Sequence, residues 1–338
     1  MAEQTGTEPS GSQNRIKNIA LVGGGGRIGS YILKFLLLGG KHHVTVLSRP
    51  ASTSVFPSHP SLTIKNIDYA SPVSIVTALT GQDVLVITMA ATAPLQQESF
   101  LIYAAAQAKV PLIMPNEWGP DFTHQGLAEG TPIIAARLAT HRGLIEDIGV
   151  SKWLAVTGGF WYEYSLASTE WMYGFDFKKK KVIFNGDGTV KINTSTWEQY
   201  ARAVTALLSL PIVPVDSEDS SSTLSNFHNK HCFISSFRVS QKDIFESVLR
   251  VTGTKECDWA ITHEDAKARR TRCLDLSQRD YKEGFRLAMY ARNFYDDGAG
   301  DFETRHGLTN DLLGLPIEDL DACTAKAVER AEKLAETY

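Results

Sequence analysis

KNIALVGGGGRIG, residues 17–29, carries the strongest structural signal in this chain. An apolar run meets four glycines here, and helix-like apolar periodicity follows from Ile28 to Leu38. This order predicts a strand, a tight turn and a helix whose first unpaired N–H groups face whatever lies over the turn. Side chains on the glycines would obstruct the turn, an approaching pyrophosphate or the packing of helix on strand. We therefore expect a dinucleotide to be held by Gly23, Gly26, Arg27, Ile28 and Gly29.

The spacing GxxGxxG differs from the commoner GxGxxG, so a flexible surface loop is the alternative interpretation. The next segment narrows the choice of dinucleotide. HVTVL at residues 43–47 alternates like a strand and leads to Arg49, where an NAD-binding fold usually carries an acidic residue. No acidic residue lies between Val44 and Ala51, and a guanidinium suits a dianionic 2′-phosphate. The pattern favours NADP(H) over NAD(H), although Arg49 is also compatible with an ordinary solvated arginine.

The composition of the 338 residues is that of a globular protein, with 43% apolar and 21% charged residues. The net charge of −4 gives no general attraction to nucleic acid or to an anionic membrane. No apolar run approaches the length needed to span a bilayer, and the four cysteines are scattered without metal-ligand spacing. The polar segment 1–15 predicts a disordered tail without an export or import signal. These features predict a cytoplasmic protein without a metal site.

Short apolar strands alternate with helices in the first half, which predicts an α/β fold with a Rossmann-like, doubly wound parallel sheet over residues 16–157. The expected strands are 17–22, 44–47, 62–67, 84–89, 111–114 and 152–157. The expected helices are 28–38, 72–79, 95–108 and 137–148. Ligands of such sheets bind beyond the carboxyl ends of the strands.

The alternation of short strands and helices ends after Thr157. Residues 158–338 are therefore expected to form a smaller α+β part that binds the substrate. Residues 185–188 (NGDG) resemble a hairpin turn, and Thr196 reads as the cap of a helix over 197–208. Further helices are expected at 241–252, 263–267 and 318–336. The serine-rich segment 211–229 is predicted to be a loop, and whether it closes over the site is left open.

Several motifs resemble one known family over residues 16–335. They are GGGGRIG, the Asp68 of NIDYASP, the strand DVLVITMA and PNEWGPD at 115–121. Together they look like the NmrA-like and isoflavone-reductase-like atypical short-chain dehydrogenases, which include plant pinoresinol–lariciresinol and phenylcoumaran benzylic ether reductases. The segments GFWYEYSL, NGDGTVKINTSTW and ARAVTALLSLP are similar to fungal members of that group.

The resemblance implies a Rossmann-like domain that binds NADPH, with the three spaced glycines at the pyrophosphate and Arg49 at the 2′-phosphate. It also implies that Thr88 and Ala90 flank the cofactor after the fourth strand. Asn116 to Trp118 would lie near the nicotinamide. Glu117 is expected to be structural, with its carboxylate holding a loop.

One departure from the family concerns proton transfer. Reductases of the family carry a lysine in a K-x-x-x-R-x-x-I-E pattern, and the lysine position falls on Leu138 here. A Tyr-x-x-x-Lys pair is absent as well. Either another group supplies the proton or the reaction needs little proton transfer, as in hydride addition to an iminium carbon. The candidate catalytic substitutes are Arg137, His141 and Tyr162, with Tyr164 as a further option.

Aromatic residues are dense next to the expected cofactor face. Core packing explains part of this density, and a pocket for a flat, largely apolar ligand explains the rest. The candidate substrate-binding residues are Trp118, Phe160, Trp161, Tyr164 and Trp171.

We expect an NADPH-dependent oxidoreductase that acts on a small aromatic or heterocyclic metabolite, such as an alkaloid, in fungal secondary metabolism. Hydride would go to a polarised C=C, C=N or benzylic carbon. A redox-neutral enzyme that couples hydride exchange to cyclisation is the first alternative, and a non-catalytic NADP(H) sensor is the second. Both a monomer and a homodimer remain open, and no nucleic-acid or membrane partner is expected.

Overall fold

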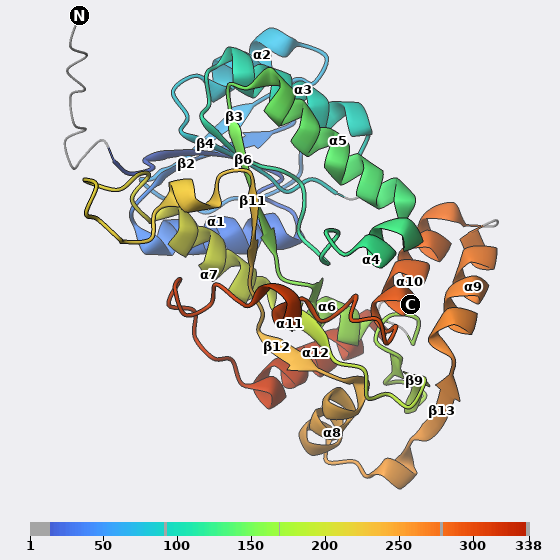
Figure 1. Ribbon diagram of the computed structural model, residues 1–338. Helices are drawn as coiled ribbons and strands as arrows, with labels where there is room; N and C mark the ends of the chain where they lie inside the picture. Colours follow the sequence, from blue (N-terminus) through green and yellow to red (C-terminus); the bar gives the residue numbers. More distant parts are fainter. Residues whose placement is uncertain (1–13, 91–92, 169, 278–279, 336–338) are drawn as a thin grey trace, which may run out of the picture.

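The computed structural model describes residues 14–90, 93–168, 170–277 and 280–335. At its centre lies a sheet of seven strands in the order β11-β6-β5-β4-β1-β2-β3, and every strand pair in it is parallel (Figure 1). The strands are β1 (Asn18–Val22), β2 (His43–Ser48), β3 (Leu62–Asn66), β4 (Val84–Ile87), β5 (Leu112–Met114), β6 (Lys152–Thr157) and β11 (Lys230–Phe233). The chain moves outward from β1 to β3 and then crosses to β4 on the other side of β1. The strand order therefore reverses between β1 and β4, which confirms the predicted Rossmann-like sheet.

Helices cover both faces of this sheet (Figure 1). One face carries α1 (Arg27–Gly39) and α7 (Trp197–Leu208), which share a core with the strands. The other face carries α2 (Pro72–Leu79), α3 (Leu95–Gln107) and α5 (Pro132–Ile148) around a separate core. Successive residues of β1 enter the two cores in turn, because side chains alternate across a strand.

The central sheet does not end at the expected boundary between residues 157 and 158. Both β11 and α7 come from the second half of the chain, and β11 pairs in parallel with β6. The helix α7 begins where the sequence predicts it, since the Thr196 hydroxyl accepts a hydrogen bond from the Gln199 N–H at 2.9 Å. The second half therefore contributes to the sheet as well as to the smaller part.

The remainder of the second half is a smaller α+β part with an aromatic core of its own. Its two three-stranded sheets contain β7 (Phe160–Trp161), β10 (Ile192–Ser195) and β12 (Phe237–Val239), and β8 (Phe175–Asp176), β9 (Lys181–Asn185) and β13 (Ala260–Glu264). Its helices are α6 (Tyr162–Ala167), α8 (Gln241–Thr252), α9 (Ala266–Ser277), α10 (Tyr281–Asn293), α11 (Phe302–His306) and α12 (Leu320–Ala335). The short α4 (Gln125–Gly130) lies against α10 and α5.

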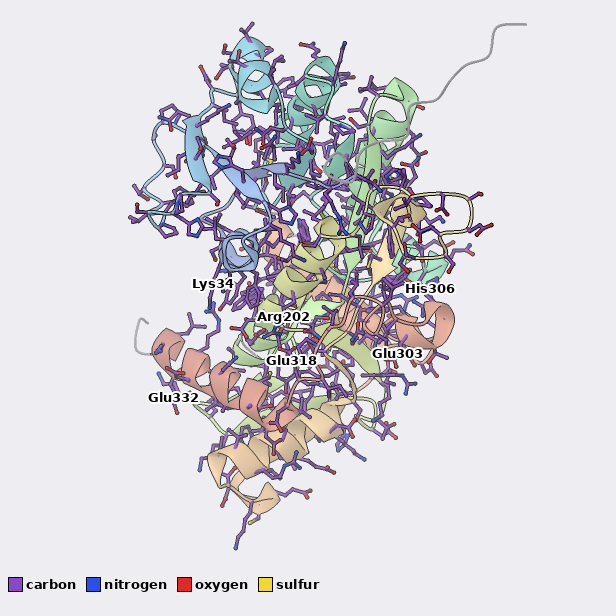
Figure 2. The ribbon with its side chains drawn as sticks, turned by 90° about the vertical axis from the view of Figure 1, so that its left-hand side faces the viewer. Lys34, Arg202, Glu303, His306, Glu318 and Glu332 are labelled. Carbon is purple, nitrogen blue, oxygen red and sulfur yellow. The ribbon has the colours of Figure 1, made fainter. Side chains whose placement is uncertain are left out.

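Glu318, just before α12, joins the two parts. Its carboxylate accepts hydrogen bonds from Arg202 of α7 at 2.9 Å and from Ser236 at 2.5 Å, and it also pairs with the Thr196 hydroxyl. Figure 2 shows Arg202 and Glu318 side by side at this junction. The C-terminal helix is thereby held against the start of α7.

Two expectations for the second half are wrong. Residues 263–267 do not form a helix, because His263 lies in β13 opposite Phe184 and α9 begins only at Ala266. Residues 185–188 do form a turn, with Gly188 N–H donating to Asn185 O at 3.0 Å, but they do not form a hairpin. The strands on either side join different sheets, β9 with β8 and β13 and β10 with β7 and β12.

The segment 211–229 lies at the edge of the sheet opposite to the glycine turn. Asn229 N–H donates to Trp153 O at 2.7 Å, near the start of β6. Val213 exchanges hydrogen bonds with the side chain of Asn14, which precedes β1. These contacts exclude a lid over the carboxyl ends of the strands. They also anchor Asn14, whereas the rest of the expected tail, up to residue 13, lies outside the described residues.

None of the helices in the described ranges combines the length and the apolar character needed to cross a bilayer.

Candidate cofactor and substrate site

The carboxyl edge of the sheet gathers the predicted cofactor residues. The glycine turn follows β1, Arg49 follows β2, Thr88 follows β4 and Asn116 follows β5. Because neighbouring strands are parallel, segments far apart in the chain meet along this one edge (Figure 1). The fold therefore places the predicted cofactor residues along one edge of the sheet.

Two glycines of the turn, Gly23 and Gly29, have no room for a side chain. Gly23 has a φ of +79°, and a Cβ there would lie 2.2 Å from the Thr88 carbonyl oxygen. A Cβ on Gly29 would lie 2.2 Å from the Gly23 carbonyl oxygen. The Thr88 hydroxyl donates to Val22 O at 2.7 Å and so joins the ends of β4 and β1. This bare backbone fits a pyrophosphate, which needs close approach to main-chain N–H groups.

The start of α1 is suited to an anion. Gly26 is the N-cap residue, makes no side-chain capping bond, and no acidic residue stands in the first turn. The N–H groups of that turn therefore have no acceptor within the helix. Arg27 is exposed at the first helical position, with its guanidinium 4.6 Å from the centre of the Tyr164 ring. Ile28 instead points into the core.

Arg49 is exposed to solvent and directly follows β2. Its charge opposes the rise that burial causes in the pKa of Tyr69. Among the described residues Arg49 forms no salt bridge, so its guanidinium is available to a ligand. The segment after it folds back on the turn, where Ser54 approaches Gly25. Ala90 is exposed beyond β4.

The PNEWG segment after β5 is fixed by three side-chain contacts. Glu117 is buried and accepts two hydrogen bonds from Arg142, at 2.7 and 2.5 Å. Burial raises the pKa of Glu117, and Arg142 opposes that rise. The Trp118 indole donates to Ile87 O at 2.7 Å, and Asn116 N–H donates to Glu98 at 2.9 Å. Glu117 therefore holds the loop, as expected.

Glu98 is a site residue that sequence reasoning missed. Its carboxylate is 1% exposed, and His141 Nδ1 lies 3.0 Å and Arg137 Nη2 3.5 Å from its Oε2 atom. His141 Nε2 has no hydrogen-bond partner among the described residues. A carboxylate on the apolar face of α3, in line with Leu101 and Ile102, was the signal available in the sequence. Arg137 and His141 thus lie in one cluster around Glu98, which also accepts a hydrogen bond from the Asn116 backbone.

Leu138, at the position of the family lysine, packs into an apolar cluster. Its neighbours there are Phe122, Leu127 and Ala299, and its side chain is buried. At the position where the sequence resemblance implies a charged side chain, α5 thus presents an apolar side chain to apolar atoms. Any proton at this site must therefore come from another residue.

Two sequence candidates lie in the core of the smaller part instead of at the site. Tyr162 is fully buried, and its hydroxyl bonds to the Thr324 hydroxyl at 2.7 Å. Burial raises its pKa well above the usual value, which makes it a poor proton donor. Phe160 stacks on Tyr290 with 3.7 Å between ring centres. The aromatic density that suggested a pocket wall is, for these two residues, core packing.

Two other aromatic candidates form a group that we call the aromatic box, together with two residues from α1 and α7. Its members are Tyr31, Trp161, Tyr164 and Trp197. Ring centres lie 5.5 Å apart for the Tyr31–Trp197 pair and 6.0 Å for the Trp161–Trp197 pair. The contact of Arg27 with Tyr164 connects the box to the first turn of α1.

The remaining aromatic candidates lie outside the box. Trp171 packs against the core of the smaller part and carries Arg272 over its ring at 4.5 Å. Trp118 meets Tyr200 edge to face, with 6.4 Å between ring centres. The structure therefore brings only Trp161 and Tyr164 of the five predicted substrate residues into direct ring contact.

Comparisons with known proteins agree with this geometry. Residues 23–116 match the NAD(P)H-binding family. The chain is 26% identical over 317 residues to the oxidoreductase AprR of Aspergillus flavus, which covers 92% of this chain and 98% of that protein.

The fold is similar to solved reductases. A structure described with pinoresinol–lariciresinol and phenylcoumaran benzylic ether reductases superposes with a TM-score of 0.72 at 18% identity, over 92% of this chain and 99% of that one. The structure of AtPrR2 with NADP⁺ and (+)-pinoresinol gives 0.64 at 17% identity, over 92% and 98%. The N-terminal segment is thus an NAD(P)H-binding unit within an isoflavone-reductase-like fold. The findings support an NAD(P)H-dependent oxidoreductase as the class of the protein.

Proposed function

We propose that the protein is an NADPH-dependent reductase that delivers hydride to a flat aromatic or heterocyclic metabolite, as in fungal secondary metabolism. The observation that carries the proposal is the glycine turn, whose missing β-carbons leave a backbone cradle at the carboxyl edge of the sheet. Arg49 stands at the same edge, where a 2′-phosphate would lie. The relationship to a fungal oxidoreductase supports the source and the reaction class.

In this proposal, different residues bind different parts of the cofactor. Gly23, Gly26 and Gly29, with the N–H groups of Arg27 and Ile28, hold the pyrophosphate. Thr88 and Ala90 border the cofactor beyond β4, and Asn116 borders the nicotinamide end. The bound cofactor supplies the hydride, and the protein supplies orientation and exclusion of water.

We propose His141 as the residue that transfers the proton. It is buried beside Glu98, its Nδ1 atom lies 3.0 Å from Glu98 Oε2, and neither ring nitrogen makes a hydrogen bond among the described residues. Glu98 Oε2 lies 3.0 Å from the ring of His141, and the other carboxylate oxygen of Glu98 accepts a hydrogen bond from the Asn116 backbone N–H. Histidine is the commonest general acid in proteins because its usual pKa lies near neutrality.

A redox-neutral reaction is the second candidate, and Leu138 is the observation that favours it. The apolar cluster around Leu138 gives no charge for proton transfer at the position where family reductases have one. Hydride exchange coupled to cyclisation would need less proton transfer. Conversion of substrate with catalytic NADP(H) would identify this reaction, whereas stoichiometric consumption of NADPH identifies the reductase.

Exchange of Arg49 tests the cofactor assignment. The Arg49→Glu variant should lose at least tenfold in NADPH affinity and change little toward NADH, because a carboxylate repels the 2′-phosphate and accepts from a 2′-hydroxyl. Isothermal titration calorimetry with both cofactors measures this. Lys41→Glu is the matched control, since Lys41 is exposed and precedes the opposite end of β2. Equal losses in the two variants would overturn the role of Arg49.

A further inference from the structure

The aromatic box and the adjacent Glu163 contain three buried polar atoms without hydrogen-bond partners. They are Glu163 Oε2, Trp161 Nε1 and Trp197 Nε1, and the statement covers the residues that the structure describes. The residues Glu163 and Trp197 are 6% and 5% exposed. Buried polar atoms are nearly always paired in folded proteins, because each unpaired one destabilises the folded state. Three such atoms in neighbouring residues therefore point to a group that completes them.

The three residues belong to one place in the fold. The rings of Trp161 and Trp197 are in contact, with centres 6.0 Å apart. Glu163 follows Trp161 by two residues at the start of α6, and the backbone N–H of Trp197, the first residue of α7, acts on its carboxylate. Two N–H donors and one carboxyl acceptor thus lie where α6, α7 and α1 meet.

The charges around the box indicate what kind of group is missing. Arg27 stands over the ring of Tyr164 and Arg330 over the ring of Trp197, at 4.6 and 5.1 Å from the ring centres. Lys326 and Glu318 also act on Glu163. Two cations already lie over rings of the box, so a further cation is not what the box lacks. The three unpaired atoms therefore fit a neutral group that has one hydrogen-bond acceptor and one N–H donor.

We infer that the aromatic box, with Glu163, is a substrate subsite for a flat cyclic secondary amide, whose carbonyl oxygen accepts from the indole N–H groups while its N–H donates to Glu163 Oε2. A ring amide presents C=O and N–H on the same edge, which matches the two kinds of unpaired atom. The aromatic rings of the box supply flat apolar contact. This inference rests on the proposed function and names the substrate class for the same site, since Arg27 joins the box to the cofactor turn.

Two small probes test the inference in the full-length protein loaded with NADP⁺. Oxindole carries the cyclic amide, and N-methyloxindole differs from it only by blocking the N–H. Ligand-observed NMR titration should show about five- to tenfold tighter binding of oxindole, which corresponds to one ordinary hydrogen bond. Glu163→Leu should remove this preference, and Glu163→Gln should keep it because the amide oxygen still accepts. Trp161→Phe should weaken both probes alike.

Matched controls keep the result independent of folding. Glu198→Gln removes a neighbouring carboxylate that pairs with Arg202, and it should leave the preference intact. Thermal melting confirms that each variant is folded. Equal affinity of the two probes for the wild-type protein, or no binding of either, would overturn the inference and leave water as the partner of the three atoms. NADPH titration of the same samples distinguishes this failure from failure of the cofactor site.

Discussion

Gly23 and Glu163 represent two ways in which single residues shape this molecule. At Gly23 both the positive φ and the 2.2 Å approach to Thr88 O exclude a side chain. Alanine at a positive φ costs about 1–2 kcal/mol before any clash is counted. Gly40 has a φ of +64° with nothing near its missing Cβ, so the two effects can be measured separately. At Glu163 the constraint is electrostatic, because a carboxylate is held away from water.

Burial raises the pKa of Glu163 to about 7, and Glu318 adds to the rise. The ordinary value in an unfolded chain is about 4.5, so between these two values the folded state holds a proton that the unfolded state has lost. Stability therefore falls as pH rises from about 4.5 to 7. We expect Glu163→Gln to stabilise the protein by up to about 3 kcal/mol at pH 8 and to make no difference near pH 4.

Urea denaturation of both proteins across this pH range measures the difference. Glu198→Gln is the comparison, and it should lose up to about 1 kcal/mol because it breaks an ion pair. A Glu163→Gln variant that is less stable than the wild type at pH 8 would show that the carboxylate is paired and charged in solution.

At the scale of elements, the sequence predicts those structures whose signals are local. Residues 152–157 and 197–208 have the predicted bounds, the first from its apolar run and the second from its Thr196 cap. The helix α9 was missed because its buried positions include Arg269, which hides the apolar periodicity. The pairing of β13 with β9 was missed because it joins segments that are remote in sequence.

In the candidate site too, the sequence predicts the features with local signals and misses those that depend on tertiary packing. The glycine turn and Arg49 are readable from the chain because each belongs to one strand–turn unit. The cluster of Glu98, His141 and Arg137 depends on how α3 and α5 pack, so no sequence spacing indicates it. The separation of Phe160 from Trp161 likewise follows from which side of a short strand faces the core.

The contact between α3 and α5 leads to a prediction for catalysis. If His141 handles the proton, His141→Gln should lower kcat for NADPH oxidation by about 10²-fold or more and leave the KM for NADPH within twofold. A panel of flat enones and iminium salts provides the substrates. Thr140→Ala is the control, since that exposed hydroxyl bonds only to Ala136 O within the helix. An unchanged kcat in His141→Gln would remove His141 from the mechanism.

At the scale of the whole molecule, the two edges of the sheet have separate roles. The carboxyl edge holds the candidate site, and the amino edge carries the segment 211–229 with its contacts to Asn14 and Trp153. The aromatic box and Glu318 join the smaller part to α1 and α7.

This arrangement predicts that the middle of the segment 211–229 does not influence cofactor binding. Replacing Asp216–Ser222 with seven alternating glycines and serines should leave the dissociation constant of NADPH within twofold, because the segment lies across the sheet from the turn. Calorimetric titration of NADPH checks this. A tenfold loss of affinity would mean that the segment reaches the carboxyl edge in solution.

The central claim is that the glycine turn seats NADP(H), and calorimetric titration of NADPH into the wild type, Gly23→Ala and Gly40→Ala tests it most directly. We predict saturable binding to the wild type and to Gly40→Ala, and at least a hundredfold loss in a folded Gly23→Ala protein, because the added Cβ meets backbone only at Gly23. Should Gly23→Ala be unfolded, Gly26→Ala, with its milder 3.1 Å approach, takes its place. Absence of NADPH binding by the wild type, or equal binding by all variants, would contradict the account.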